Sequence, residues 1–347
     1  MARQLSERFG LAAHFTNLTD LLQKVQPDVV HITTPPQSHF ALAKQCLQAG
    51  AHVYVEKPFT LNTPDAEALI ALAQEKRRLI TAGHNDQFHC AARRMRELVR
   101  EGYLGGPAVH LESYYGYELG HDSNYARALL ADKEHWVRKL PGQLLHNIIS
   151  HGIARIAEYL PGETAHVVAY GFSSPLLRSL GEEELVDELR VIISGAEGTT
   201  GYFTFSSQMR PVLHQFRVYG PRNGLILDQD NETLVQLPGR RYKSYAEHFL
   251  SPLVMAKQYV QNTVRSVRTF CANDLHPKGS LRFFVQSFYR AINEGTPMPL
   301  TYREILLTSR IMDSIFEQIR SRNSAKRSSP GHEQGVAAPE AHPSLAS

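Results

Sequence analysis

Three short apolar runs, each followed by a stretch with helical character, occupy the first hundred residues. They are DVVHITTP (28–35), HVYVEKP (52–58) and LITAGHN (79–85). Regular alternation of strand and helix is typical of a parallel sheet flanked by helices. The sequence therefore predicts that this part of the chain folds as an α/β unit.

Capping residues support the helices expected between the runs. The first helix closes at Gly50, which suits a left-handed cap. The second is predicted to begin with Thr63 as its cap, Pro64 at the first helical position and Asp65 near the positive helix start. Both helix boundaries lie between the predicted strands, as an alternation of strand and helix requires.

The pattern changes after about residue 106. Residues 108–118, 188–207 and 214–237 alternate apolar and polar side chains over long stretches. Such alternation favours a largely antiparallel, open sheet with one covered face. The predicted fold class is thus α/β, with an incomplete parallel sheet followed by an α+β domain.

These patterns divide the chain into three parts. Residues 1–105 are expected to form the first domain and residues 106–320 the second. Residues 321–347 are rich in Ser, Ala and Pro and contain no aromatic residue, so we expect a disordered tail.

Composition excludes several classes of protein. The net charge is only +3 and the basic residues are scattered, which argues against a nucleic-acid partner. No apolar run approaches the roughly 20 residues of a membrane span. The three cysteines are far apart and form neither a disulfide framework nor a metal-ligand spacing. We expect a cytoplasmic protein without a membrane or nucleic-acid partner.

Polar residues follow each of the three apolar runs. Glu56 and Lys57 end the second run, and the segments TTPPQSH (33–39) and GHNDQF (83–88) end the other two. In an open parallel sheet, ligands bind beyond the carboxyl ends of the strands. These segments are therefore predicted to line a binding site.

The same segments resemble the Gfo/Idh/MocA family. The resemblance rests on DVVHITTPPQSH, GAHVYVEKPFTLN, AGHNDQFH and HWVRKLPGQLLHNIISHGIARIAEYL, in that order, and extends over about residues 2–320. It implies a dinucleotide-binding Rossmann domain and a second domain whose open sheet forms a homodimer or homotetramer interface. It also implies hydride transfer between NAD or NADP and a hydroxyl-bearing carbon of a sugar, cyclitol or related polyol.

The resemblance implies site residues as well. The catalytic lysine of the family falls on Lys57, and its aspartate and histidine fall on Asn147 and His151. His151 would be the general base, Lys57 would stabilise the developing alkoxide and Glu56 would hold the lysine. The cofactor-binding positions are Thr34, Pro35, His39, Glu56, Lys57, Pro58, Asn85, Trp136 and Arg138.

Asn147 departs from the family pattern. Asparagine can orient a histidine but cannot stabilise its charged form as a carboxylate does. Either the neighbouring His146 compensates, or the position reflects a different substrate. The sequence does not identify the substrate, because the pocket residues follow no general pattern. Candidate lining residues are Tyr114, Tyr115, Tyr117 and His121, but these side chains could equally be exposed on the surface or packed in the core.

The front of the chain also departs from the family. No G-x-G-x-x-G turn is present, and residues 12–17 stand where the family has its third strand. The strand at 28–33 would then have an open edge. We expect that the native protein begins upstream, or that this chain is a remnant that holds a dinucleotide weakly.

Two other functions compete with the oxidoreductase reading. A non-catalytic, ligand-sensing or regulatory protein of the same fold would agree with Asn147 and the missing glycine turn. A metal-dependent hydrolase is suggested by seventeen histidines. His135, His146 and His151 lack the four-residue spacing that places two ligands on one helical face, so no metal is expected.

Overall fold

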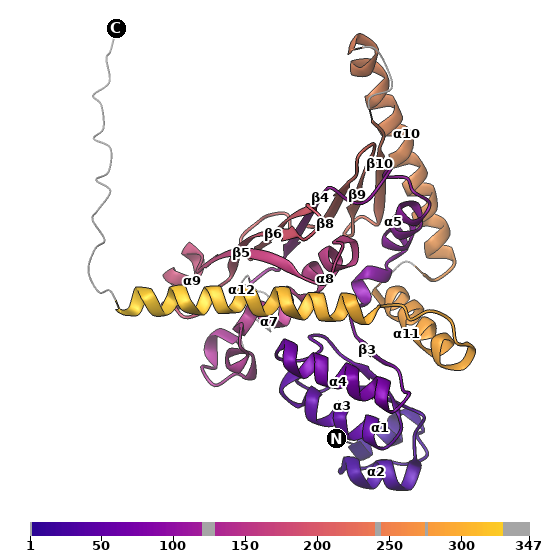
Figure 1. Ribbon diagram of the computed structural model, residues 1–347, viewed down its shortest axis with the longest axis vertical. Helices are drawn as coiled ribbons and strands as arrows, with labels where there is room; N and C mark the ends of the chain where they lie inside the picture. Colours follow the sequence, from indigo (N-terminus) through magenta and orange to yellow (C-terminus); the bar gives the residue numbers. More distant parts are fainter. Residues whose placement is uncertain (1, 120–128, 240–243, 275–276, 329–347) are drawn as a thin grey trace.

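The computed structural model describes residues 2–119, 129–239, 244–274 and 277–328. Two sheets organise these residues, each with its own buried core. Figure 1 shows the small N-terminal unit below helix α12 and the larger sheet above it.

The first sheet is parallel, as predicted. Its strands are β1 (Val29–Ile32), β2 (His52–Val55) and β3 (Ile80–Ala82), in the order β1-β2-β3. Strand β2 is central, and its Val53 and Val55 are completely buried. The surrounding helices are α1 (Ala2–Phe9), α2 (Leu18–Val25), α3 (His39–Gln48) and α4 (Thr63–Glu75).

Two local predictions for this unit are wrong. Helix α4 is capped by Asn62, whose side chain accepts the Asp65 amide, so Thr63 is already helical. Residues 12–17 form no strand: the Asn17 side chain instead accepts the Thr19 amide and caps α2. A strand needs a hydrogen-bonded neighbour, and among the described residues β1 pairs only with β2.

The second sheet has seven strands in the order β10-β9-β8-β4-β7-β6-β5. Within it β4 and β7 run parallel, and every other neighbouring pair is antiparallel, which confirms the predicted fold class. The strands are β4 (His110–Gly116), β5 (Ala165–Phe172), β6 (Glu188–Gly195), β7 (Thr200–Ser206), β8 (His214–Tyr219), β9 (Gly224–Asp228) and β10 (Thr233–Leu237).

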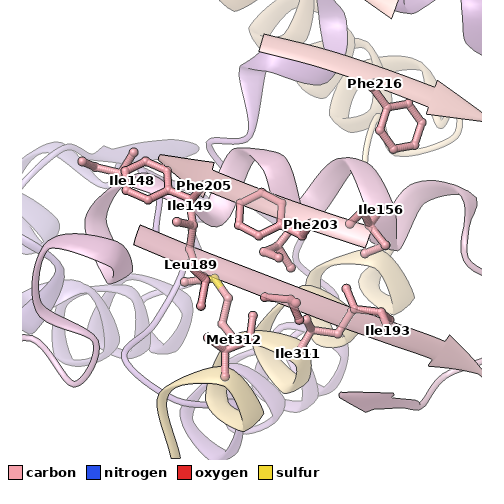
Figure 2. Packing of buried hydrophobic residues seen from close by; sticks show 14 of the residues in the cluster. Ile148, Ile149, Ile156, Leu189, Ile193, Phe203, Phe205, Phe216, Ile311 and Met312 are labelled. Atoms are coloured by element: carbon pink, nitrogen blue, oxygen red, sulfur yellow. The ribbon is translucent and has the colours of Figure 1, made fainter. Parts of the chain in front are cut away.

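Helices α8 (Ser150–Tyr159) and α12 (Tyr302–Ser328) cover one face of this sheet. Figure 2 shows Ile156 of α8 and Ile311 of α12 packed toward Phe203 and its neighbours on the strands. Gly152 allows this close approach, because a Cβ there would lie 2.5 Å from Cε2 of Phe203. The packing fixes the start of α8 against the sheet.

The remaining helical elements connect and flank the sheets. Helix α12 continues to Ser328, so the predicted disordered tail does not begin at 321; residues 329–347 of that prediction lie outside the described residues. No described helix is long and apolar enough to cross a membrane. The helices that connect and flank the sheets are η1 (Pro36–Ser38), η2 (Asn85–Phe88), α5 (Cys90–Arg100), η3 (Trp136–Lys139), α7 (Gln143–Ile148), α9 (Pro175–Ser179), α10 (Ser244–Cys271) and α11 (Pro277–Glu294).

Candidate active site

Lys57 lies just beyond the carboxyl end of β2 and reaches the second domain. Its Nζ donates a hydrogen bond of 2.8 Å to the backbone carbonyl of Asn147. Glu56 does not hold the ammonium group directly. Its Oε2 accepts the backbone amide of Lys57 at 3.0 Å, and its Oε1 accepts the Tyr54 hydroxyl at 3.1 Å. The Lys57–Pro58 peptide is cis.

His151 is the second residue of α8, and Asn147 belongs to the separate helix α7. The nearest carboxylate to the His151 ring comes from elsewhere: Oδ2 of Asp86 lies 3.7 Å from Nδ1 of His151. The ring also stacks on Tyr115, with centroids 6.3 Å apart and planes at 19°. These three residues line one small pocket with Arg155.

Asp86 is held in its ionised form. Burial opposes ionisation, but the charges of His151, His89 and Arg155 outweigh it and keep the pKa of Asp86 well below its usual range. Its side chain is 16% exposed, and its Oδ2 accepts the Tyr115 hydroxyl at 3.3 Å. Arg155 donates to the backbone carbonyl of Asp86 at 2.6 Å, which anchors the residue.

The pKa of His151 is lowered to about 4. Burial is the main cause, the Asp86 carboxylate raises the pKa, and the charges of Lys57 and Arg155 lower it. The ring is therefore neutral near pH 7 and can accept a proton. Burial also lowers the pKa of Lys57, against the opposing carboxylates of Glu56 and Asp86.

A second buried histidine faces His151. The ring of His84, at the end of β3, meets the His151 ring edge-on with centroids 6.0 Å apart. Burial first, and then the charges of His151 and Lys57, lower the pKa of His84 to about 3. Its Nε2 has no hydrogen-bond partner among the described residues. His84 therefore stays neutral beside the proposed base.

Several predicted cofactor residues gather at the carboxyl edge of the first sheet. Thr34 and Pro35, after β1, are exposed, and Asn85, after β3, donates to Ser280 Oγ at 3.2 Å. His39 is different, because it is completely buried between the carbonyl oxygens of Thr34 (2.8 Å) and Pro58 (2.9 Å). His39 links these two loops.

Trp136 and Arg138 are placed differently from each other. The carbonyl of Trp136 accepts Gln37 Nε2 at 3.0 Å, so this segment adjoins the loop after β1. The guanidinium of Arg138 instead donates to Leu129 and to Glu182, at 2.7 Å for the acid. Burial opposes ionisation of Glu182, yet the hydrogen bonds of Arg138 and Lys133 lower its pKa to about 2. Arg138 is thus engaged in a structural ion pair.

The sequence reasoning missed Asp86 as a site residue. Its position in GHNDQF, at a strand end, was the available signal. His146, the candidate to compensate for Asn147, stacks on Phe316 with ring centroids 4.8 Å apart. Tyr114 and Tyr115 both line the pocket, and Tyr117 packs against the core of the second sheet. His121 lies outside the described residues.

Comparisons with known proteins identify relatives in sequence and in fold. The model of the GFO/IDH/MocA family, described as "Oxidoreductase family, NAD-binding Rossmann fold", matches residues 1–84. Myo-inositol 2-dehydrogenase of Thermotoga maritima is 22% identical over 277 residues, which are 78% of this chain and 76% of that protein. Residues 1–84 of the chain therefore match the Gfo/Idh/MocA family.

Other relatives match shorter stretches of the chain. UDP-N-acetylglucosamine 3-dehydrogenase of Acidithiobacillus ferrooxidans is 43% identical over 83 residues, 24% of this chain and 26% of that protein. The sequence match thus spans about a quarter of the length of that dehydrogenase. In fold, WlbA dehydrogenase of Bordetella pertussis, solved with NADH and UDP-GlcNAcA, has a TM-score of 0.69 at 13% identity and covers 92% of this chain and 85% of that one.

Proposed function

We propose that this protein is an NAD(P)-dependent oxidoreductase. It transfers a hydride between nicotinamide and a hydroxyl-bearing carbon of a sugar, cyclitol or related polyol. The observation that carries the proposal is the convergence of Lys57, His151 and Asp86 from three separate segments at the carboxyl end of the parallel sheet.

The residues present suit the nicotinamide half of the cofactor. Exposed Thr34 and Pro35 and the amide of Asn85 would hold it, and His39 and Pro58 would position their loops. When bound, the nicotinamide supplies or accepts the hydride. The 347 residues contain no G-x-G-x-x-G turn to bind the pyrophosphate, so affinity for NADH and NADPH is the quantity to measure.

The proposed residues have separate roles in removing the hydroxyl proton and stabilising the charges that result. Neutral His151 takes the proton of the substrate hydroxyl, a role that contributes roughly 10²–10⁴-fold in general-base catalysis. The ammonium of Lys57 hydrogen-bonds the same oxygen and stabilises its negative charge. Asp86 stabilises the imidazolium that forms, because its carboxylate faces Nδ1. Asp86 thereby supplies the charge that Asn147 lacks.

Asp86→Asn tests this division. The amide keeps the shape but removes the charge that raises the pKa of His151, so the acid limb of the oxidative rate should move to lower pH. We expect kcat/KM to fall roughly 10- to 100-fold, a part of the general-base contribution. The measurement is kcat/KM against pH, with Asp20→Asn, an exposed change on α2, as the control. An unchanged rate and profile would remove Asp86 from the mechanism.

We also propose that the protein is a cytoplasmic homodimer or homotetramer assembled through the open face of the second sheet. That face exposes large apolar side chains on neighbouring strands, with about half of each side chain accessible: Val168, Tyr170, Ile192 and Tyr202. All three cysteines are free, which suits a reducing compartment. A contiguous apolar face of this kind is typical of protein interfaces.

The deciding experiment combines binding with turnover. NADH and NADPH are titrated by fluorescence into the purified chain and into a version extended through any upstream in-frame codons. Hydride transfer is then followed with myo-inositol, UDP-N-acetylglucosamine and other polyols. We expect nicotinamide reduction with at least one polyol. Ligand binding without hydride transfer across the panel would instead support the non-catalytic, ligand-sensing alternative.

A further inference from the structure

Helix α10 turns its polar face toward the protein. Asn262 Oδ1 accepts the amide of Leu234 at 3.3 Å, and Asn262 Nδ2 donates to the carbonyl of the same residue at 3.0 Å. Gln258 makes the matching pair with Gln236, at 2.7 and 3.0 Å. The two side-chain amides therefore pair with backbone groups on the free edge of β10. An edge strand leaves such groups without a partner strand.

The opposite face of α10 is apolar and exposed. Phe249 is 74% exposed, Leu253 and Val260 are each 65% exposed, and Phe270 is 71% exposed. Seven positions, all exposed, follow each other at intervals of four and three residues: Phe249, Leu253, Ala256, Val260, Thr263, Val267 and Phe270. We call these seven residues the α10 stripe. Figure 1 shows α10 at the outer margin of the sheet, extending beyond β10.

Spacing and area both fit a helical partner. Alternation of three and four residues is the pattern of a coiled-coil seam. Pro252 lies inside the helix between the first two stripe positions, so the seam without a proline runs from Leu253 to Phe270. Each fully exposed aromatic side chain presents roughly 150–250 Å². Tyr245, Phe249, Tyr259 and Phe270, together with the aliphatic residues of the stripe, approach the roughly 800 Å² that each partner buries in a standard interface.

We propose that the α10 stripe pairs with the α10 stripe of a second copy of this chain, with the two helices antiparallel. An alignment centred on residue 258 places Phe249 opposite Val267, Leu253 opposite Thr263, and Ala256 opposite Val260. Large residues then face smaller ones, whereas a parallel pair would set Phe249 against Phe249 and Ala256 against Ala256. This interface is separate from the open sheet face and independent of the proposed activity.

Charge supports the antiparallel direction. The basic residues Arg265 and Arg268 lie near the C-terminal end of α10, and the acidic Glu247 lies in its first turn. Antiparallel pairing brings opposite charges and opposite helix-dipole ends together, while parallel pairing brings like charges together. A closed two-fold pair also leaves no unpaired copy of the stripe.

The molecular mass in solution tests the proposal. Leu253→Glu combined with Val260→Glu buries charge in the seam without touching Gln258 or Asn262. Because the open sheet face is a separate interface, the unmodified protein should be a tetramer. We expect light scattering to show half its mass for the double variant, with the dimer through the sheet face retained and an unchanged circular dichroism spectrum. Gln261→Glu, exposed on the same helix outside the stripe, is the matched control. An unchanged mass for the double variant would overturn the proposal.

Disulfide trapping tests the direction of pairing. Two differently tagged chains, one with Phe249→Cys and one with Val267→Cys, both carry Cys271→Ser to remove the exposed native thiol. Antiparallel pairing predicts cross-links between unlike chains, since like positions would lie roughly 27 Å apart at 1.5 Å per residue. Cross-links between like chains would overturn the alignment. Binding of unmodified protein to phosphatidylserine vesicles without self-association would show that the stripe instead contacts lipid, and would overturn the proposal.

Discussion

Lys57→Met is expected to reduce turnover by about 10²–10³-fold, the cost of removing one donor from a developing oxyanion. Methionine keeps the length of the side chain, but it cannot donate to the substrate oxygen or to the Asn147 carbonyl. The loss should appear in kcat and kcat/KM alike, because the interaction is strongest in the transition state. The measurement is steady-state reduction of the nicotinamide by the polyol substrate.

The control for this prediction is Lys44→Met, which removes an exposed lysine from α3 of the same unit. Its turnover should match that of the unmodified protein. Thermal unfolding of both variants should show that the fold persists. Near-normal turnover of Lys57→Met would refute the assignment of Lys57 as the group that stabilises the alkoxide.

His151→Ala is expected to remove the pH dependence of the oxidative direction and to reduce its rate by roughly 10²–10⁴-fold. Since the pKa of His151 is lowered to about 4, its ring loses the bound proton as pH rises through that value. The unmodified enzyme should therefore be most active above this value and lose activity below it. In the variant no such acid limb should remain.

The pH profile of kcat/KM measures this effect. His14→Ala, at an exposed position before α2, serves as the control for a histidine outside the site. If His151→Ala kept the acid limb, another group would be the base. His84 would then be the first alternative, because its buried ring faces His151 and its pKa is lowered to about 3.

Local pattern was sufficient to predict much of the fold. The alternation of apolar runs and capped helices predicted the parallel sheet, because burial and capping act on residues close in sequence. The same reasoning failed at residues 12–17, where strand formation depends on a neighbouring strand rather than on local composition. The start of α4 was displaced by one residue because Asn62, rather than Thr63, bonds to the helix amides.

The sequence by itself determined the placement of Lys57 at a strand end, since that position follows directly from the apolar run before it. Only the tertiary structure decided that Asp86, rather than Asn147, faces His151, because packing of α8 on the sheet brings together segments 65 residues apart. The tertiary structure likewise decided that Arg138 forms an ion pair with Glu182. A heptad spacing marks one apolar face of α10 but not the direction in which that face points. The amides of Gln258 and Asn262 on the edge of β10 turn it outward.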